Sequence, residues 1–305
     1  MRKTILAFLI FLYSHHINVK VMPVRRQSRI YNVVLILFFS FVICIYSAND
    51  MWQSVNTQTE GVKLTILMYH GFTDGGKESD YVLDVKNFEK DIVYLKNQGF
   101  SFVDSKDITD YVYKGKKLPE KCVIISFDDG YLNNYIYAYP VIKKHNVKAI
   151  VSPIAYYVEY YSINEDRNPN YSHLTDKEIK EMHSSGLIDF GNHSYNMHSL
   201  EGRKGSLKLS EEKAEDYIRE FYYDLKAAEN VIEDITGEKP TSYAYPFGSI
   251  SRESVSILKC CGYKVSFGCE EGFNTLTFGN PDCLLKLRRF NRTPGRSAEQ
   301  ILLKY

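Results

Sequence analysis

Short apolar runs alternate with longer amphipathic segments over most of the chain. The apolar runs have the length of strands and predict them at Leu64–Tyr69, Phe100–Val103, Val123–Phe127, Ala149–Pro153, Ile188–Gly191, Tyr243–Pro246, Tyr263–Phe267 and Leu285–Phe290. The segments between them predict helices at Asn87–Gln98, Tyr131–His145, Thr175–Ser185, Glu211–Ile235 and Ser251–Cys261. Alternating strands and helices imply a parallel sheet, and this number of units in one domain favours a (β/α) barrel over an open sheet.

Local signals support the predicted helix boundaries. Thr175 and Glu178 form a capping-box pattern at the start of one helix, and Gly237 follows the end of another. Pro140 lies inside the Tyr131–His145 segment, where it predicts a kink or a break.

The N-terminal part of the chain has a different pattern. The apolar stretch Val33–Tyr46 follows three arginines between positions 25 and 29 and precedes the small residues Ser47 and Ala48. This is the pattern of an export signal, and its basic flank should stay on the cytoplasmic side. The length of the stretch is consistent with a cleaved signal or with a membrane anchor, and both interpretations stay open.

These patterns divide the chain into three parts. We expect residues 1–48 to be an export signal or membrane anchor, with residues 1–21 an upstream misreading of the start as an alternative. Residues 49–62 are polar and predict a tether, and residues 63–305 predict one folded domain. That domain would be secreted or held at the extracellular face of the cell membrane.

Composition narrows the choice of partners. The chain has 38 basic and 37 acidic residues, so its net charge of +1 offers no basic field for nucleic acid. Its 25 tyrosines suit sugar binding, although drift in the composition of the genome explains them equally well. We expect a monomer.

Residues that can carry chemistry follow several of the predicted strands. They are His70, Asp128, Asp129, His193, His198 and Phe247. In a barrel the carboxyl ends of the strands share one mouth, so these residues should lie close together. The remaining histidines on or beside predicted helices, His145, His173 and His183, are interpreted as surface residues.

The Asp128-Asp129 pair and the two later histidines suit a metal site. Adjacent residues of a strand point to opposite faces, so both carboxylates reach one site only if the chain turns, which Gly130 permits. On a helix, residues five apart are about 140° apart around the axis, so His193 and His198 should lie on a strand end and a loop. Two histidines and one carboxylate suit a single divalent ion, zinc first, with cobalt, nickel or manganese as alternatives.

The motifs around these residues resemble those of the NodB-homology polysaccharide deacetylases, carbohydrate esterase family 4, over about residues 62–295. Ser126-Phe127-Asp128-Asp129-Gly130 is similar to the first motif of that family. His193-Ser194 with His198 is similar to the second motif, and Tyr243–Gly248 to the third. The resemblance implies a distorted (β/α)7 barrel, with Asp128 as catalytic base and with Asp129, His193 and His198 as metal ligands. It also implies that Tyr245 and Phe247 belong to a groove wall, with the Phe247 N–H facing the oxyanion.

Three departures from the commoner motifs point to one branch of this family. The metal-binding histidines are five apart instead of four, Ala244 stands where an arginine is usual, and no C-terminal Leu-x-His motif is present. Together with His70 after the first strand, they resemble the branch that contains poly-N-acetylglucosamine deacetylases, which implies that His70 is the catalytic acid. Arg288 or Arg289 is a candidate for the missing arginine, and a basic pair on an exposed strand fits the sequence equally well.

The implied activity is the hydrolysis of N-acetyl groups on an N-acetylglucosamine polymer of the cell envelope or of a biofilm, with release of acetate. Two alternatives remain: a non-catalytic carbohydrate-binding protein on the same scaffold, and a deacetylase of another acylated polymer such as acetyl-xylan. Substrate choice would depend on the loops Tyr156–Tyr171 and Glu201–Ser210, which the sequence does not resolve.

Overall fold

The computed structural model describes residues 40, 61–164 and 166–303. Apart from residue 40, the predicted export segment lies outside these residues, as does nearly all of the predicted tether. The chain divides into two compact units, Met1–Thr59 and Glu60–Tyr305, and the fold described below is that of the second unit. Within the described ranges, no helix combines the length and the apolar character needed to cross a membrane.

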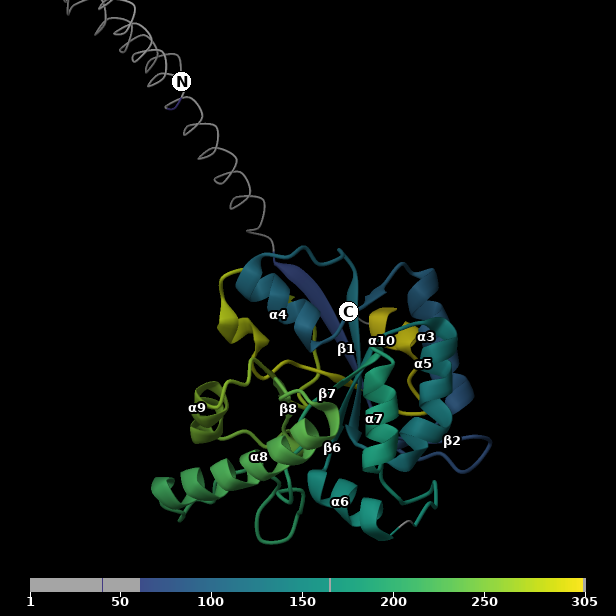
Figure 1. Ribbon diagram of the computed structural model, residues 1–305. Helices are drawn as coiled ribbons and strands as arrows, with labels where there is room; N and C mark the ends of the chain where they lie inside the picture. The colour runs from purple at the N-terminus through teal and green to yellow at the C-terminus, as the bar shows by residue number, and fades with distance from the viewer. Residues whose placement is uncertain (1–39, 41–60, 165, 304–305) are drawn as a thin grey trace, which may run out of the picture. The chain divides into compact units, whose positions relative to one another are not determined.

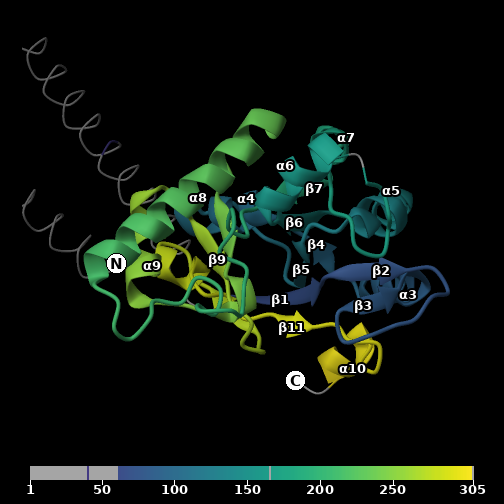
Figure 2. The same ribbon diagram turned by 90° about the horizontal axis from the view of Figure 1, so that it is seen from below.

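Parallel strands close into a ring around the centre of this unit. The ring is formed, in spatial order, by β11 (Phe290–Asn291), β1 (Val62–Tyr69), β5 (Cys122–Asp129), β6 (Ala149–Pro153), β7 (Ile188–Phe190), β8 (Ser242–Ala244) and β9 (Val265–Phe267). Figure 2 shows the strands from β11 to β7 in this order. Single parallel bridges join β7 to β8 through Asn192 and Tyr243, and β9 to the β11 segment through Phe267 and Leu287. The fold is therefore a distorted (β/α)7 barrel, as expected.

Helices surround this ring (Figure 1). They are α3 (Val85–Asn97), α4 (Ser105–Lys114), α5 (Tyr139–His145), α6 (Ala155–Asn164), α7 (Asp176–Ser184), α8 (Ala214–Thr236), α9 (Arg252–Cys260) and α10 (Ala298–Leu303). The short strands β2 (Gly71–Thr73) and β3 (Val82–Asp84) pair with each other. Strand β4 (Ser101–Phe102) pairs in parallel with the start of β5, and β10 (Asn274–Leu276) pairs antiparallel with β1.

The strands alternate between two apolar layers, as their pleat requires. Leu64, Ile66 and Ile124 belong to one buried cluster, whereas Leu67 and Ile125, one position along the same strands, belong to a second cluster. The second cluster includes Phe88 and Ile92 of α3, so it lies between the strands and the helices. Burial of both faces explains why these strands read as continuous apolar runs.

Most of the predicted helix boundaries are confirmed. The capping box of Thr175 and Glu178 is formed at the start of α7, and α8 ends at Gly237 in the left-handed conformation. The segment that contains Pro140 is interrupted as expected, because a π-helix at Asn134–Ala138 precedes α5.

Two predictions about local structure are wrong. The predicted strand Leu285–Phe290 is reduced to Phe290–Asn291, with Lys286 at a positive φ of 59°. The first part of Tyr156–Tyr171, expected to be a loop, belongs to the helix α6, which runs from Ala155 to Asn164. Tyrosines lie on several sides of α6, so the apolar periodicity that reveals an amphipathic helix is missing.

Candidate active site

The two adjacent aspartates lie at the point where β5 ends and the chain turns. Asp129 and Gly130 both have positive φ values, 67° and 71°. A side chain at residue 130 would come within 2.6 Å of Pro153 Cβ, so only glycine fits this turn. Both carboxylates are buried at the carboxyl end of the strand, in agreement with the turn expected from the sequence.

Asp129, His193 and His198 meet at this end of the barrel. The Nε2 atoms of His193 and His198 lie 3.3 and 3.2 Å from Asp129 Oδ1. One ligand atom from each residue lies within 4.8 Å of the others. Both histidines stand outside any helix, on the segment that follows β7, as their spacing predicted.

The tautomer of His193 suits a metal ligand. Its Nδ1 donates a hydrogen bond to the Ala244 carbonyl oxygen at 2.7 Å, which leaves the Nε2 lone pair directed toward Asp129. This is the arrangement by which proteins orient a metal-binding imidazole. Ala244, where the commoner motif has an arginine, contributes through its backbone.

The buried Asn192 and the partly buried Asp224 hold the segment that carries the histidines. Asn192 Oδ1 accepts a hydrogen bond from the N–H of Ser194, which has a positive φ of 73°, and Asn192 Nδ2 contacts the hydroxyl of Tyr263 at 2.8 Å. The carboxylate of Asp224, on α8, accepts hydrogen bonds from the N–H groups of Tyr195 and Asn196. The loop is thus fixed on both sides of His193.

The donor set of these residues fits a divalent metal. Asp129 Oδ1 is buried and has no hydrogen-bond donor among the described residues. Burial would raise the pKa of the Asp129 carboxyl, but its contacts with His193 and His198 outweigh burial and lower that pKa well below its ordinary value. A buried, ionised carboxylate beside two imidazole nitrogens is a ligand set that zinc and related ions accept.

Asp128 forms a separate ion pair with Arg289. Arg289 Nη1 and Nη2 donate to the two oxygens of Asp128, each at 2.7 Å, and Arg289 Nε donates to the Gly268 carbonyl at 2.8 Å. Burial would raise the pKa of the Asp128 carboxyl, but the guanidinium outweighs burial and lowers it. Of the two arginines that the sequence left open, Arg289 is buried against Asp128, whereas Arg288 is exposed and pairs with Glu270.

His70 follows β1 at the same end of the barrel. Its ring lies edge-on to Tyr81, with centroids 4.9 Å apart, and its Nδ1 is buried without a hydrogen-bond partner in the described part of the chain. Burial lowers the pKa of the His70 imidazole, and the nearby charges of Asp128 and Asp129 oppose this effect. The imidazole therefore stands close to both carboxylates with one ring nitrogen available.

Phe247 and Tyr245 occupy different places. Phe247 lies in the first turn of the 3-10 helix Pro246–Gly248 and has a positive φ of 56°. The N–H groups of a first turn have no acceptor within their own helix. Its ring lies 4.5 Å from that of His198. Tyr245 is fully buried behind this turn, with its hydroxyl 3.2 Å from Ser254 Oγ. The Tyr245 side chain thus packs into the core, and the assignment of this residue to a groove wall stays a prediction.

His173 is also placed differently from the prediction. It was expected at the surface, but it is buried between Tyr131 and Tyr157, with ring centroids 4.7 and 4.3 Å away. Burial lowers the pKa of His173 to about 4. Burial and, after it, the nearby Asp129 carboxylate raise the pKa of the Tyr131 hydroxyl, so this aromatic group borders the candidate metal ligand Asp129. Only the position of Tyr131 directly after Gly130 hinted at this role in the sequence.

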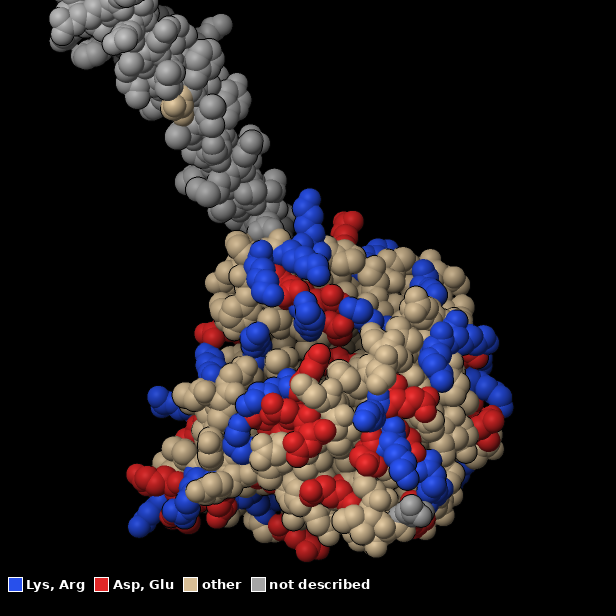
Figure 3. Space-filling view, in the orientation of Figure 1, with Lys and Arg blue, Asp and Glu red and all other residues tan. Residues whose placement is uncertain are grey.

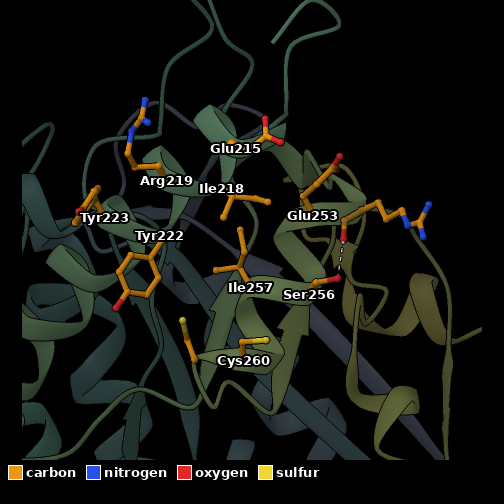
Figure 4. Close-up of a pocket in the computed structure, with 11 residues that line it drawn as sticks. Glu215, Ile218, Arg219, Tyr222, Tyr223, Glu253, Ser256, Ile257 and Cys260 are labelled. Atoms are coloured by element: carbon orange, nitrogen blue, oxygen red, sulfur yellow. Dashed lines mark hydrogen bonds between the residues drawn. The ribbon is translucent and has the colours of Figure 1, made fainter. Parts of the chain in front are cut away.

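On the face of the molecule shown in Figure 3, neither basic nor acidic side chains predominate. Acidic and basic side chains are interspersed there, in keeping with a net charge of +1 (Figure 3). A hollow of about 790 Å³ lies between α8 and α9 and is lined by Tyr222, Tyr223, Ile257 and Cys260 among others (Figure 4). None of the site residues described above lines it.

Comparisons with known proteins agree with this fold. The family model described as "Polysaccharide deacetylase" matches residues 115–266. A Poly-beta-1,6-N-acetyl-D-glucosamine N-deacetylase of Staphylococcus aureus is 28% identical over 200 residues, which are 66% of this chain and 65% of that protein, just under two thirds of its length. The solved structure of IcaB from Ammonifex degensii is 27% identical, with a TM-score of 0.66, and covers 81% of this chain and 97% of its own. A de-N-acetylase from Aggregatibacter actinomycetemcomitans is 21% identical, with a TM-score of 0.69 over 80% of this chain and 100% of its own, and shares the fold.

Proposed function

Because this chain belongs to the polysaccharide deacetylase family, we propose that it removes N-acetyl groups from an N-acetylglucosamine polymer and releases acetate. The observation that carries this proposal is that two adjacent carboxylates at one strand end have different partners. Asp129 faces two imidazoles, and Asp128 faces a guanidinium. In this proposal one carboxylate binds a cation and the other stays ionised for proton transfer.

In this proposal Asp129, His193 and His198 hold one divalent ion, with zinc as the first choice. Such an ion, when bound, polarises the acetamide carbonyl and lowers the pKa of water. The hydrogen bond from His193 Nδ1 to Ala244 keeps the ligating nitrogen directed inward before any ion arrives.

The remaining residues move protons and stabilise charge. Asp128, ionised beside Arg289, accepts a proton from the water that attacks the acetamide carbon. The Phe247 N–H donates to the oxygen on which negative charge develops. His70 donates a proton to the nitrogen as the carbon–nitrogen bond breaks, and its lowered pKa makes its imidazolium a stronger acid. The products are acetate and a glucosamine unit.

The choice of substrate is supported by the names of the relatives. The staphylococcal relative is named for poly-beta-1,6-N-acetyl-D-glucosamine, and the match covers 66% of this chain. We propose that the polymer acted on here contains N-acetylglucosamine and belongs to the cell envelope or a biofilm. We further propose that the enzyme acts outside the cell, carried there by the apolar segment near its N-terminus.

The experiment that tests this proposal measures acetate release from β-1,6-linked N-acetylglucosamine oligomers and, in parallel, from acetyl-xylan. The zinc-loaded protein should release acetate from the oligomers, and a chelator should stop the release. Asp128→Asn is the matched control, because it should lose turnover while keeping its metal. Release from acetyl-xylan alone, or binding of oligomers without any release, would overturn the proposal.

A further inference from the structure

Three tyrosines on α6 form an exposed aromatic surface. Tyr156, Tyr157 and Tyr160 are 40%, 37% and 45% exposed, whereas Ala155, Val158 and Tyr161 form the buried side of the helix. The rings of Tyr156 and Tyr160 are stacked at 6.3 Å with an angle of 26° between their planes. This leaves a patch of adjacent ring faces in contact with solvent, which we call the α6 tyrosine surface.

The α6 tyrosine surface is continuous with the candidate active site. Helix α6 begins directly after β6, and its first N–H groups donate to the carbonyls of Ser194 and Tyr195, on the segment that carries the two metal-binding histidines. The Tyr157 ring stacks on His173 at 4.3 Å and 21°. His173 in turn lies against Tyr131, which stands two residues after Asp129 in the turn that follows β5. A chain of ring contacts therefore runs from Tyr131, close to Asp129 in the sequence, through His173 to Tyr157 on α6.

We propose that the α6 tyrosine surface binds the sugar units next to the one that is being deacetylated, an inference that rests on the proposed function. Tyrosine offers an apolar face to the C–H groups of a pyranose ring and a hydroxyl to its polar groups. A neutral polymer needs no charged partner at such a surface. The α6 sequence AYYVEYYSIN contains no lysine or arginine, so it lacks the basic residues that attract anionic lipid surfaces.

The exposed tyrosines of α8 provide a contrast. Tyr222 and Tyr223 line the separate hollow beside α9 together with charged side chains such as Arg219 and Glu253 (Figure 4). No ring contact links them to the metal ligands in the described part of the chain. The α6 tyrosine surface therefore differs from the exposed tyrosines of α8 in its contacts with the residues of the candidate active site.

The test compares kcat/KM for β-1,6-linked N-acetylglucosamine oligomers of increasing length. In the double variant Tyr156→Ala/Tyr160→Ala, the ratio of kcat/KM for a hexamer to that for a dimer should fall about threefold to tenfold. The reason is that about one stacking contact is removed. Tyr156→Phe/Tyr160→Phe should restore most of it, since the ring faces remain. The matched control is Tyr113→Ala, on α4 at the opposite end of the barrel, where the ring is 48% exposed (Figure 1). The control should keep the wild-type ratio.

Binding of the hexamer, measured by calorimetry with the same variants, tests the surface independently of turnover. A weaker affinity in the alanine double variant supports the inference even if no acetate is released, in which case only the proposed function fails. Equal affinities and equal length dependence in the wild type and the double variant would overturn the inference while leaving the proposed function intact.

Discussion

Replacement of Arg289 by methionine should convert a well-ionised base into a poorly ionised one. Arg289 and Asp128 are 0% and 2% exposed and share two hydrogen bonds of 2.7 Å. Methionine fills a similar length of the cavity without charge. The variant therefore leaves the Asp128 carboxylate buried without its cation.

The size of the effect follows from this burial. Removing one partner of a buried ion pair costs about 3–5 kcal/mol of stability, because the other charge is left uncompensated. In the wild type the guanidinium holds the pKa of Asp128 below its ordinary value, against burial. Without Arg289, burial dominates and the pKa of Asp128 rises. Each unit by which the pKa of Asp128 rises corresponds to about 1.4 kcal/mol in the free-energy difference between its protonated and ionised forms.

The assay is the pH dependence of kcat/KM for acetate release. A base works only when ionised, so activity is lost as pH falls through its pKa. In Arg289→Met this acid limb should therefore move to higher pH, and the loss of activity should be greater at pH 6 than at pH 8.5. The stability contribution has the same sign: in the wild type it is present above the unfolded pKa of Asp128 and is lost as pH falls through the folded one.

Arg292→Met is the matched control for this experiment. Arg292 is also buried and bonds to a buried carboxylate, that of Asp91, at 2.6 Å, where the hydroxyl of Tyr69 is also bonded. It should lose stability to a similar extent but keep the acid limb of the wild type. An unshifted acid limb in a folded Arg289→Met protein would refute the reasoning, as would an equal shift in the control.

Three further predictions concern other parts of the site. His70→Ala should lower kcat by about 10²-fold or more with metal content unchanged; near-normal turnover would place the acid elsewhere. Asp129→Ala should bind zinc at least about tenfold more weakly, measured by competition with a chromogenic chelator, because one of three ligands is lost; retained affinity would contradict its role. Gly130→Ala should lower the free energy of unfolding, measured by urea denaturation, by about 1–3 kcal/mol, because φ is 71° and the new Cβ would meet Pro153. Gly99→Ala, with φ of 78° and open space around it, should lose less, and equal losses would show that the contact with Pro153 is unimportant.

The sequence was sufficient for the elements whose signals are local. β5 is buried on both faces, so its continuous apolar run marked the strand, and Gly130 marked its end. The spacing of His193 and His198 excluded a helix, and the structure places both outside one. Because all parallel strands of a barrel end at one mouth, the meeting of residues from separate strand ends followed from the same pattern.

The sequence could not assign side chains whose roles depend on distant packing. Tyr245 lies in a motif that suggested a groove, yet its ring faces the core beneath α9. His173 carries no periodic signal, and its place beside Tyr131 and Tyr157 depends on a backbone bridge and ring contacts between distant segments. Likewise, the aromatic residues of α6 lie on several sides of the helix and so concealed it.

The sequence by itself thus determined the barrel and the residues at its strand ends, because strand periodicity and turn chemistry are properties of a few neighbouring residues. Only the tertiary structure decided between Arg288 and Arg289. Arg288 and Arg289 lie 160 and 161 positions after Asp128 in the chain. The choice depends on which of these two adjacent side chains faces inward once β11 pairs with β1. That register is fixed by the closure of the whole barrel, so no local pattern could reveal it.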